Sequence, residues 1–263
     1  LGISNLHSIG TDWGNLSPSA YRKAVNNNWW IQNDTRFNFS AAYADFSASE
    51  GGRGKQRSSR SCTLLNQNNG SIDLLTMIST ISDHSDGEVP DEPIKSDMPN
   101  TRAICMHHGP NSTSNTAGTL VADLCSDESR LAVYWCSFYS PCLGIFLPMF
   151  SEGEIPSILS KGDGVSSEGS PWWIFREIAR SARVDNEFDM GSVSKIRNGW
   201  QGMQQELLVS AYQIAAEARL MISKGKESQG TRLLNKYMRR NVTEALKIAK
   251  ELTKEVLITA GSA

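Results

Sequence analysis

The sequence predicts an α+β fold in which an antiparallel sheet is formed between two helical regions. Apolar residues recur every three or four positions before residue 82 and again from Pro171 to the end, which is typical of amphipathic helices. Between Thr101 and Phe150 the pattern changes to short apolar runs rich in β-branched and aromatic residues, which indicate strands. Helices, then strands, then helices favour an antiparallel sheet over alternating βαβ units.

The first helical region begins after residues 1–8, which are predicted to be the end of a strand. A helix from Ser17 to about Asn28 is predicted, because serine is a favoured N-cap and Pro18 suits the first helical position. An aromatic-rich stretch, Phe37–Phe46, predicts a short second helix. After a glycine-rich break, a third is predicted over Gln56–Leu65.

A fourth helix is predicted up to Ile81, with Ser71 as its cap. Its apolar residues have helical spacing. They are Ile72, Leu75, Ile78 and Ile81.

Four strands are then expected in an antiparallel meander. They are Ala103–Met106, Gly118–Cys125, Leu131–Phe138 and Leu143–Met149. Ser126–Ser129 is a hairpin-sized connection, and Tyr139–Pro141 indicates a break between the last two strands. Ser151–Ser170, rich in Gly, Ser and Glu, is predicted to be a loop or linker.

Two long helices are predicted after Pro171. Apolar residues repeat at helical spacing over Met203–Met221 and again over Leu234–Val256. Because only Gly225–Gly230 separates the two segments, we expect them to pair as an antiparallel hairpin.

Composition excludes some classes of function. The 263 residues include 26 basic and 28 acidic side chains, so a strongly basic nucleic-acid-binding protein is not expected. The longest apolar runs fall well short of the ~18 residues that a membrane span needs, so no membrane partner is expected. Five scattered cysteines without a C-x-x-C pair do not suit a disulfide framework, which favours a reducing, cytoplasmic location.

Two groups of residues have types that are common in functional sites. Cys105-Met106-His107-His108 contains metal-ligating types, but neighbouring side chains of a strand alternate between faces and no second pair has suitable spacing. We therefore predict no metal and no cofactor, and only weakly a Cys105–His108 nucleophile pair. Arg57 and Arg60, near one helix face, suit binding of a carboxylate or acyl oxygen, although solvent-facing arginines on a surface helix are the simpler interpretation.

Several stretches, taken in order, resemble the secernin and dipeptidase A family of cysteine N-terminal-nucleophile (Ntn) hydrolases. The resemblance covers about residues 1–150, and the family also has a helical hairpin at its C-terminus. The stretches are Leu1–Trp13, Phe37–Phe39, Thr76–His84 with Gly87, Thr116–Thr119, Tyr134–Trp135, Ser140–Cys142 and Ile145–Phe150.

The resemblance implies an αββα sandwich and an amide hydrolase of the dipeptidase type. In this superfamily the nucleophile is a cysteine at the first position of the mature chain, and its own α-amino group acts as the general base. Asn5 resembles the asparagine that donates to the oxyanion or to substrate. Arg57 resembles a second active-site arginine, with Arg60 as the alternative.

The family's nucleophile lies upstream of the stretch that resembles Leu1–Asn5. None of the five cysteines here can replace it, because each is internal and lacks a free α-amino group. We therefore expect this chain to be the portion of a thiol hydrolase downstream of its nucleophile and to be inactive alone. Its partner would be an upstream segment or another copy of the chain, and its substrate a small peptide or acyl-amide. A non-catalytic, secernin-like interaction or trafficking module is the alternative.

The domain organisation expected from the resemblance has three parts. Residues 1–150 would be the C-terminal part of an Ntn-hydrolase-like domain, 151–170 a loop or linker, and 171–263 a helical region packing on the same domain.

Overall fold

The structure of the chain, a computed structural model, describes residues 8–31, 35–44, 53–84, 103–107, 115–184 and 187–260. Helices and antiparallel strands are both present, so the predicted α+β class is confirmed. Asn5 and the predicted strand end at residues 1–8 lie outside the described residues, apart from Ser8. The chain divides into two compact units, Leu1–Asn69 and Gly70–Ala263, which are described separately.

The first unit contains the helices predicted before residue 70. They are α1 (Pro18–Asn26), α2 (Phe39–Tyr43) and α4 (Arg53–Gln67). Pro18 occupies the first turn of α1, as predicted, and Asn38 caps α2 by accepting a hydrogen bond from the backbone of Ala41 at 2.9 Å. A small aromatic cluster surrounds Phe37, whose ring meets the edges of Tyr21 and Trp30.

The second unit begins with α5 (Leu74–Ile81), whose predicted cap was wrong. Asp73, not Ser71, caps the helix, because its carboxylate accepts hydrogen bonds from the backbone N–H and the hydroxyl of Thr76, each at 2.7 Å. An aspartate at this position also interacts favourably with the positive end of the helix dipole. The helix therefore begins two residues later than a Ser71 cap would place it.

An antiparallel sheet of three strands follows: β1 (Gly118–Asp123), β2 (Val133–Phe138) and β3 (Leu147–Met149), in that order. In its register Leu120 pairs with Cys136, and Trp135 pairs with Pro148. A second, two-stranded sheet, β4 (Arg183–Val184) and β5 (Glu187–Phe188), was not predicted.

The first of the four predicted strands, Ala103–Met106, was wrong. This segment forms bends, because its backbone bonds to two separate parts of the chain instead of to one neighbouring strand. The N–H of Cys105 donates to the carbonyl of Asp83 at 3.0 Å, and the N–H of Met106 donates to the hydroxyl of Thr116 at 2.8 Å.

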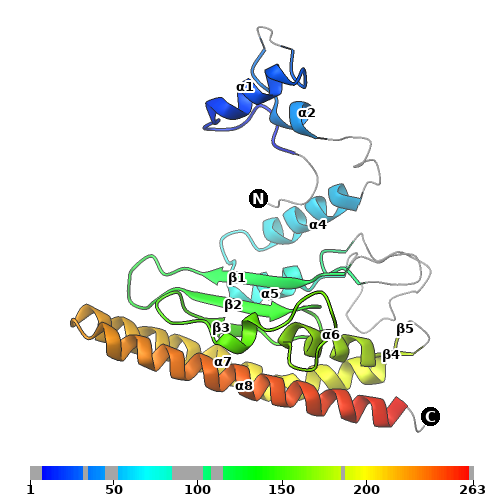
Figure 1. Cartoon of the computed structure of the whole chain (residues 1–263), viewed down its shortest axis with the longest axis vertical. Helices are drawn as coiled ribbons and strands as arrows, with labels where there is room; N and C mark the ends of the chain where they lie inside the picture. Colours follow the sequence, from blue (N-terminus) through cyan, green and yellow to red (C-terminus); the bar gives the residue numbers. More distant parts are fainter. Residues whose placement is uncertain are drawn as a thin grey trace. The chain divides into compact units, whose positions relative to one another are not determined.

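The predicted helical hairpin is confirmed by α7 (Met190–Ser223) and α8 (Glu227–Ala260), which run side by side in Figure 1. Gly225, with φ +71°, turns the chain between them. The shorter α6 (Pro171–Ser181) precedes the hairpin, and a 3₁₀ turn, η1 (Ser157–Ser160), lies within the predicted loop 151–170. Small buried residues let the two long helices approach closely. They include Ala211, Ala215, Ala218, Ala245 and Ala249.

One hydrophobic core joins the sheet to these helices. Trp135 and Phe150 from the strand region belong to the same buried cluster as Ile178, Leu207 and Met238 from α6, α7 and α8. Among the helices that the structure describes, none has the length and apolar character needed to cross a bilayer.

Candidate metal centre

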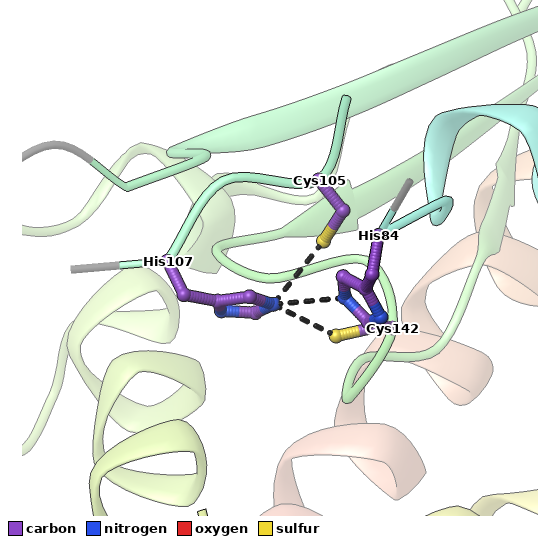
Figure 2. A group of neighbouring side chains, drawn as sticks. All are labelled: His84, Cys105, His107 and Cys142. Atoms are coloured by element: carbon purple, nitrogen blue, oxygen red, sulfur yellow. Dashed lines mark hydrogen bonds between the residues drawn. The ribbon is translucent and has the colours of Figure 1, made fainter. Parts of the chain in front are cut away.

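Four side chains with metal-ligating atoms meet in the second unit. His84 follows α5, Cys105 and His107 come from the bent segment 103–107, and Cys142 lies in the turn after β2. Figure 2 shows the two thiols and the His84 ring directed at the Nε2 atom of His107. One ligand atom from each of the four residues lies within 4.8 Å of the other three.

Three short distances meet at Nε2 of His107. This atom lies 3.0 Å from Nε2 of His84, 3.5 Å from Sγ of Cys105 and 3.3 Å from Sγ of Cys142. An imidazole nitrogen carries either one proton or one lone pair, so it makes one good hydrogen bond at a time. Hydrogen bonding among the four residues therefore does not account for three convergent contacts at one nitrogen.

Neighbouring segments hold the ligands by backbone contacts. The Cys105 N–H bonds to Asp83, the residue before His84. The Nε of Arg197, in α7, donates to the carbonyl of Cys142 at 3.1 Å. Tyr139 begins the turn that carries Cys142 with a positive φ of 59°. Backbone outside the preferred regions is maintained only where surrounding contacts hold it, so this turn is a rigid support for the ligand.

A second layer of contacts orients the ring of His107. Its Nδ1 lies 3.3 Å from the hydroxyl of Ser140, which also accepts a hydrogen bond from the side-chain amide of Asn115 at 3.3 Å. When Nδ1 carries the proton and donates it to the Ser140 hydroxyl, the lone pair is on Nε2. This lone pair then faces the other three ligands. Phe188 packs against the same ring in a T-shaped contact, with centroids 4.9 Å apart.

The cluster is largely shielded from water. Cys105 is fully buried and His107 is 2% exposed, whereas His84 and Cys142 are partly buried. Burial raises the pKa of the Cys105 thiol. Hydrogen bonding from Cys105, reinforced by the nearby His107, lowers the pKa of Cys142. Cys142 is therefore the thiol that ionises first.

Asn5, Arg57 and Arg60, the site residues that the resemblance implies, are not among these four side chains. Asn5 and His108 lie outside the described residues. Arg57 and Arg60 both lie on α4, in the first unit, so their predicted helical setting is confirmed.

Sequence reasoning found half of this cluster and dismissed it. Cys105 and His107 were noticed, and a strand would have placed both on one face because they are two residues apart. They were dismissed because His84 and Cys142 are distant in sequence, so no second ligand pair was apparent at a suitable spacing. The sequence did contain a signal, because His84 and Cys142 are both metal-ligating residue types and each lies beside the end of a predicted helix or strand. A search over long spacings would have included them.

Comparison with known proteins adds no identification. No protein-family model matches the chain, and no curated protein is similar enough to count as a match. What the chain does is therefore inferred from its residues and their geometry.

Proposed function

We propose that this chain is the portion of an Ntn amide hydrolase that lies downstream of the nucleophile, with dipeptides or related acyl-amides as substrates. The observation that carries the proposal is that three of the stretches resembling the secernin and dipeptidase A family are neighbours in space. They come together around the short segment 103–107.

Each stretch contributes a specific contact to this meeting point. His84, the last residue of the stretch Thr76–His84, contacts His107 at 3.0 Å. Thr116, the first residue of Thr116–Thr119, bonds to Met106 through both its hydroxyl and its N–H. Ser140–Cys142 contacts both nitrogens of His107. Stretches that are distant in sequence and contact one another belong to one folded unit, as a family resemblance that spans them requires.

In the proposed reaction, a cysteine at the start of the mature protein attacks the amide carbonyl, and its α-amino group takes up the thiol proton. The α-ammonium group then gives this proton to the leaving amine as the C–N bond breaks, which leaves an acyl-enzyme. Asn5 would donate to the oxyanion or to substrate, and Arg57, or Arg60 in its place, would bind a substrate carboxylate or acyl oxygen. Water then hydrolyses the acyl-enzyme. An upstream segment or another copy would supply the nucleophile, so this chain alone should be inactive.

The alternative is a non-catalytic, secernin-like interaction or trafficking module. This function would need no nucleophile, and the five cysteines of the chain are all internal. The same five cysteines are free thiols in the structure. Because thiols persist in a reducing compartment, we propose a cytoplasmic location for either function.

Hydrolysis of dipeptides by the full-length protein tests the proposal. We expect activity that is lost when the cysteine at the mature N-terminus is replaced by alanine, and that is weakened by Asn5→Ala. Cys125→Ser is a matched control, because this thiol lies in the turn after β1. Activity that does not depend on the N-terminal cysteine would exclude the mechanism. A mature N-terminus without Cys, Ser or Thr would favour the interaction module.

A further inference from the structure

We propose that His84, Cys105, His107 and Cys142 bind one Zn²⁺ ion as a structural, four-coordinate site. The proposal replaces the expectation from the sequence that the chain binds no metal. It does not depend on the proposed hydrolase function, because it concerns only residues of this chain and a ligand that is independent of substrate.

The spacing of the ligand atoms fits tetrahedral zinc. Ordinary Zn–N and Zn–S bond lengths place two nitrogens about 3.3 Å apart and a nitrogen and a sulfur about 3.6 Å apart. The two nitrogens here are 3.0 Å apart, and the two nitrogen–sulfur distances at His107 are 3.5 and 3.3 Å. These three distances are slightly shorter than those around a bound zinc ion, and the remaining separations among the four ligand atoms are no more than 4.8 Å.

The donor set selects the metal. Two thiolates and two imidazoles are soft or borderline ligands that suit Zn²⁺, whereas Mg²⁺ and Ca²⁺ prefer oxygen ligands. Two ionised cysteines, two neutral histidines and Zn²⁺ sum to zero charge, so the filled site avoids leaving an unpaired charge in this buried place. Binding releases the protons that the two thiols still carry.

The contacts around the ligands also resemble those of a metal site. Metal-bound histidines usually donate their second ring N–H to a fixed acceptor, and the Nδ1 of His107 has Ser140 as that partner. Asn115 fixes the Ser140 hydroxyl in turn. With four protein ligands no coordination position remains for water or substrate, which distinguishes a structural site from a catalytic one.

The ion would connect three parts of the second unit. It would tie the end of α5, through His84, to the segment 103–107 and to the turn that carries Cys142. Among the described residues, the backbone bond from Cys105 to Asp83 joins two of these parts. The metal would add links among all three, so it would stabilise this corner more than the core around α7 and α8.

Metal analysis of the purified chain tests the proposal directly. We expect about one equivalent of zinc per chain. Cobalt added to the chelator-treated protein should give the absorption of tetrahedral Co²⁺ bound by two thiolates. Chelation should lower the melting temperature, and zinc alone should restore it.

Variants identify the ligands. Cys105→Ser, Cys142→Ser and His84→Gln should each lose most of the bound zinc, whereas Cys125→Ser should keep it. Cys125 bonds to Asp127 in a turn outside the cluster, and a serine hydroxyl can make the same contact. Ser140→Ala keeps all four ligands and should weaken zinc binding by roughly 10- to 100-fold, as expected of a residue that positions His107.

The outcomes separate clearly. If a ligand variant does not fold, the absorption spectrum of the cobalt-bound wild-type chain still reports how many thiolates bind the metal. A chain that binds neither zinc nor cobalt, that contains iron instead, or that retains zinc without Cys105 and Cys142 would overturn the proposal. A zinc-loaded chain whose full-length form hydrolyses no peptide would contradict only the proposed hydrolase.

Discussion

The phenol of Tyr212, in α7, donates a hydrogen bond of 2.6 Å to the carboxylate of Asp123, at the end of β1. The other carboxylate oxygen accepts from Arg130 at 2.7 Å, and the Arg130 guanidinium lies over the Tyr212 ring. These three side chains fasten the helical hairpin to one end of the sheet.

Removing the hydroxyl group of Tyr212 should destabilise the second unit. Because Tyr212 donates to a charged acceptor and is partly buried, Tyr212→Phe is expected to lower the free energy of unfolding by about 1 to 2 kcal/mol. Chemical denaturation measures the change. Combining it with Asp123→Asn in a double-mutant cycle isolates the pairwise contribution, and a coupling energy near zero would contradict this role.

The same pair predicts a dependence on alkaline pH. Burial, together with Asp123, raises the pKa of Tyr212 in the folded protein. Its contribution to stability is therefore complete below about pH 10, where an unfolded tyrosine is protonated, and declines as the pH rises further. The stability advantage of wild type over Tyr212→Phe should shrink between pH 10 and 11, and a constant difference would contradict the assignment.

Two glycines of α7 should respond oppositely to alanine. A Cβ at Gly202 would meet nothing within 4 Å, so Gly202→Ala should raise the free energy of unfolding by about 0.5 to 1 kcal/mol through helix propensity. A Cβ at Gly199 would collide with Leu252 of α8, so Gly199→Ala should instead lower it by about 1 kcal/mol. Thermal melts of the two variants compare them directly, and equal effects would contradict the close packing of α7 on α8.

The aromatic cluster of the first unit should be lost by one substitution. Phe37 is 5% exposed and contacts the surrounding rings, so Phe37→Ala is expected to cost about 3 kcal/mol. Since Phe37 belongs to a cluster separate from the main core, hydrogen exchange should accelerate in α1 and α2 but not in α7 or α8. Faster exchange in both units would show that they unfold together.

The two arginines of α4 can be distinguished by kinetics in the full-length protein. If Arg57 binds a substrate carboxylate, Arg57→Ala should lower kcat/KM by roughly 10- to 100-fold, and lysine should restore it only in part because it lacks the paired donors. Arg60→Ala, on the same helix, is the matched control. The reverse order would assign the role to Arg60, and no effect from either would remove α4 from the proposed site.

Helices were more predictable than the rest of the fold. The repeat over Met203–Met221 and Leu234–Val256 identifies α7 and α8, because burying one face of a long helix imposes a period on many residues. A run as short as Ala103–Met106 has no such redundancy. Its conformation depends on bonds to Asp83 and Thr116, which no local pattern reports.

The candidate metal centre was less predictable still. Its ligands come from three separate segments, and only the tertiary fold brings His84 and Cys142 to Cys105 and His107. Short zinc motifs are recognisable because two ligands share one turn or hairpin. Here Cys105 and His107 alone are near neighbours, and the other two ligands are far from them in the sequence.

The tight turn at Gly225 has a consequence for the order of folding. Residues on either side of it are close along the chain, so α7 and α8 can begin to pair there with little loss of chain entropy and then extend outward. Strand contacts with the hairpin, such as the bond from the N–H of Leu131 to the carbonyl of Ala215, close much longer loops. We therefore expect the hairpin to form first and the sheet to assemble against it in the slower, rate-limiting step.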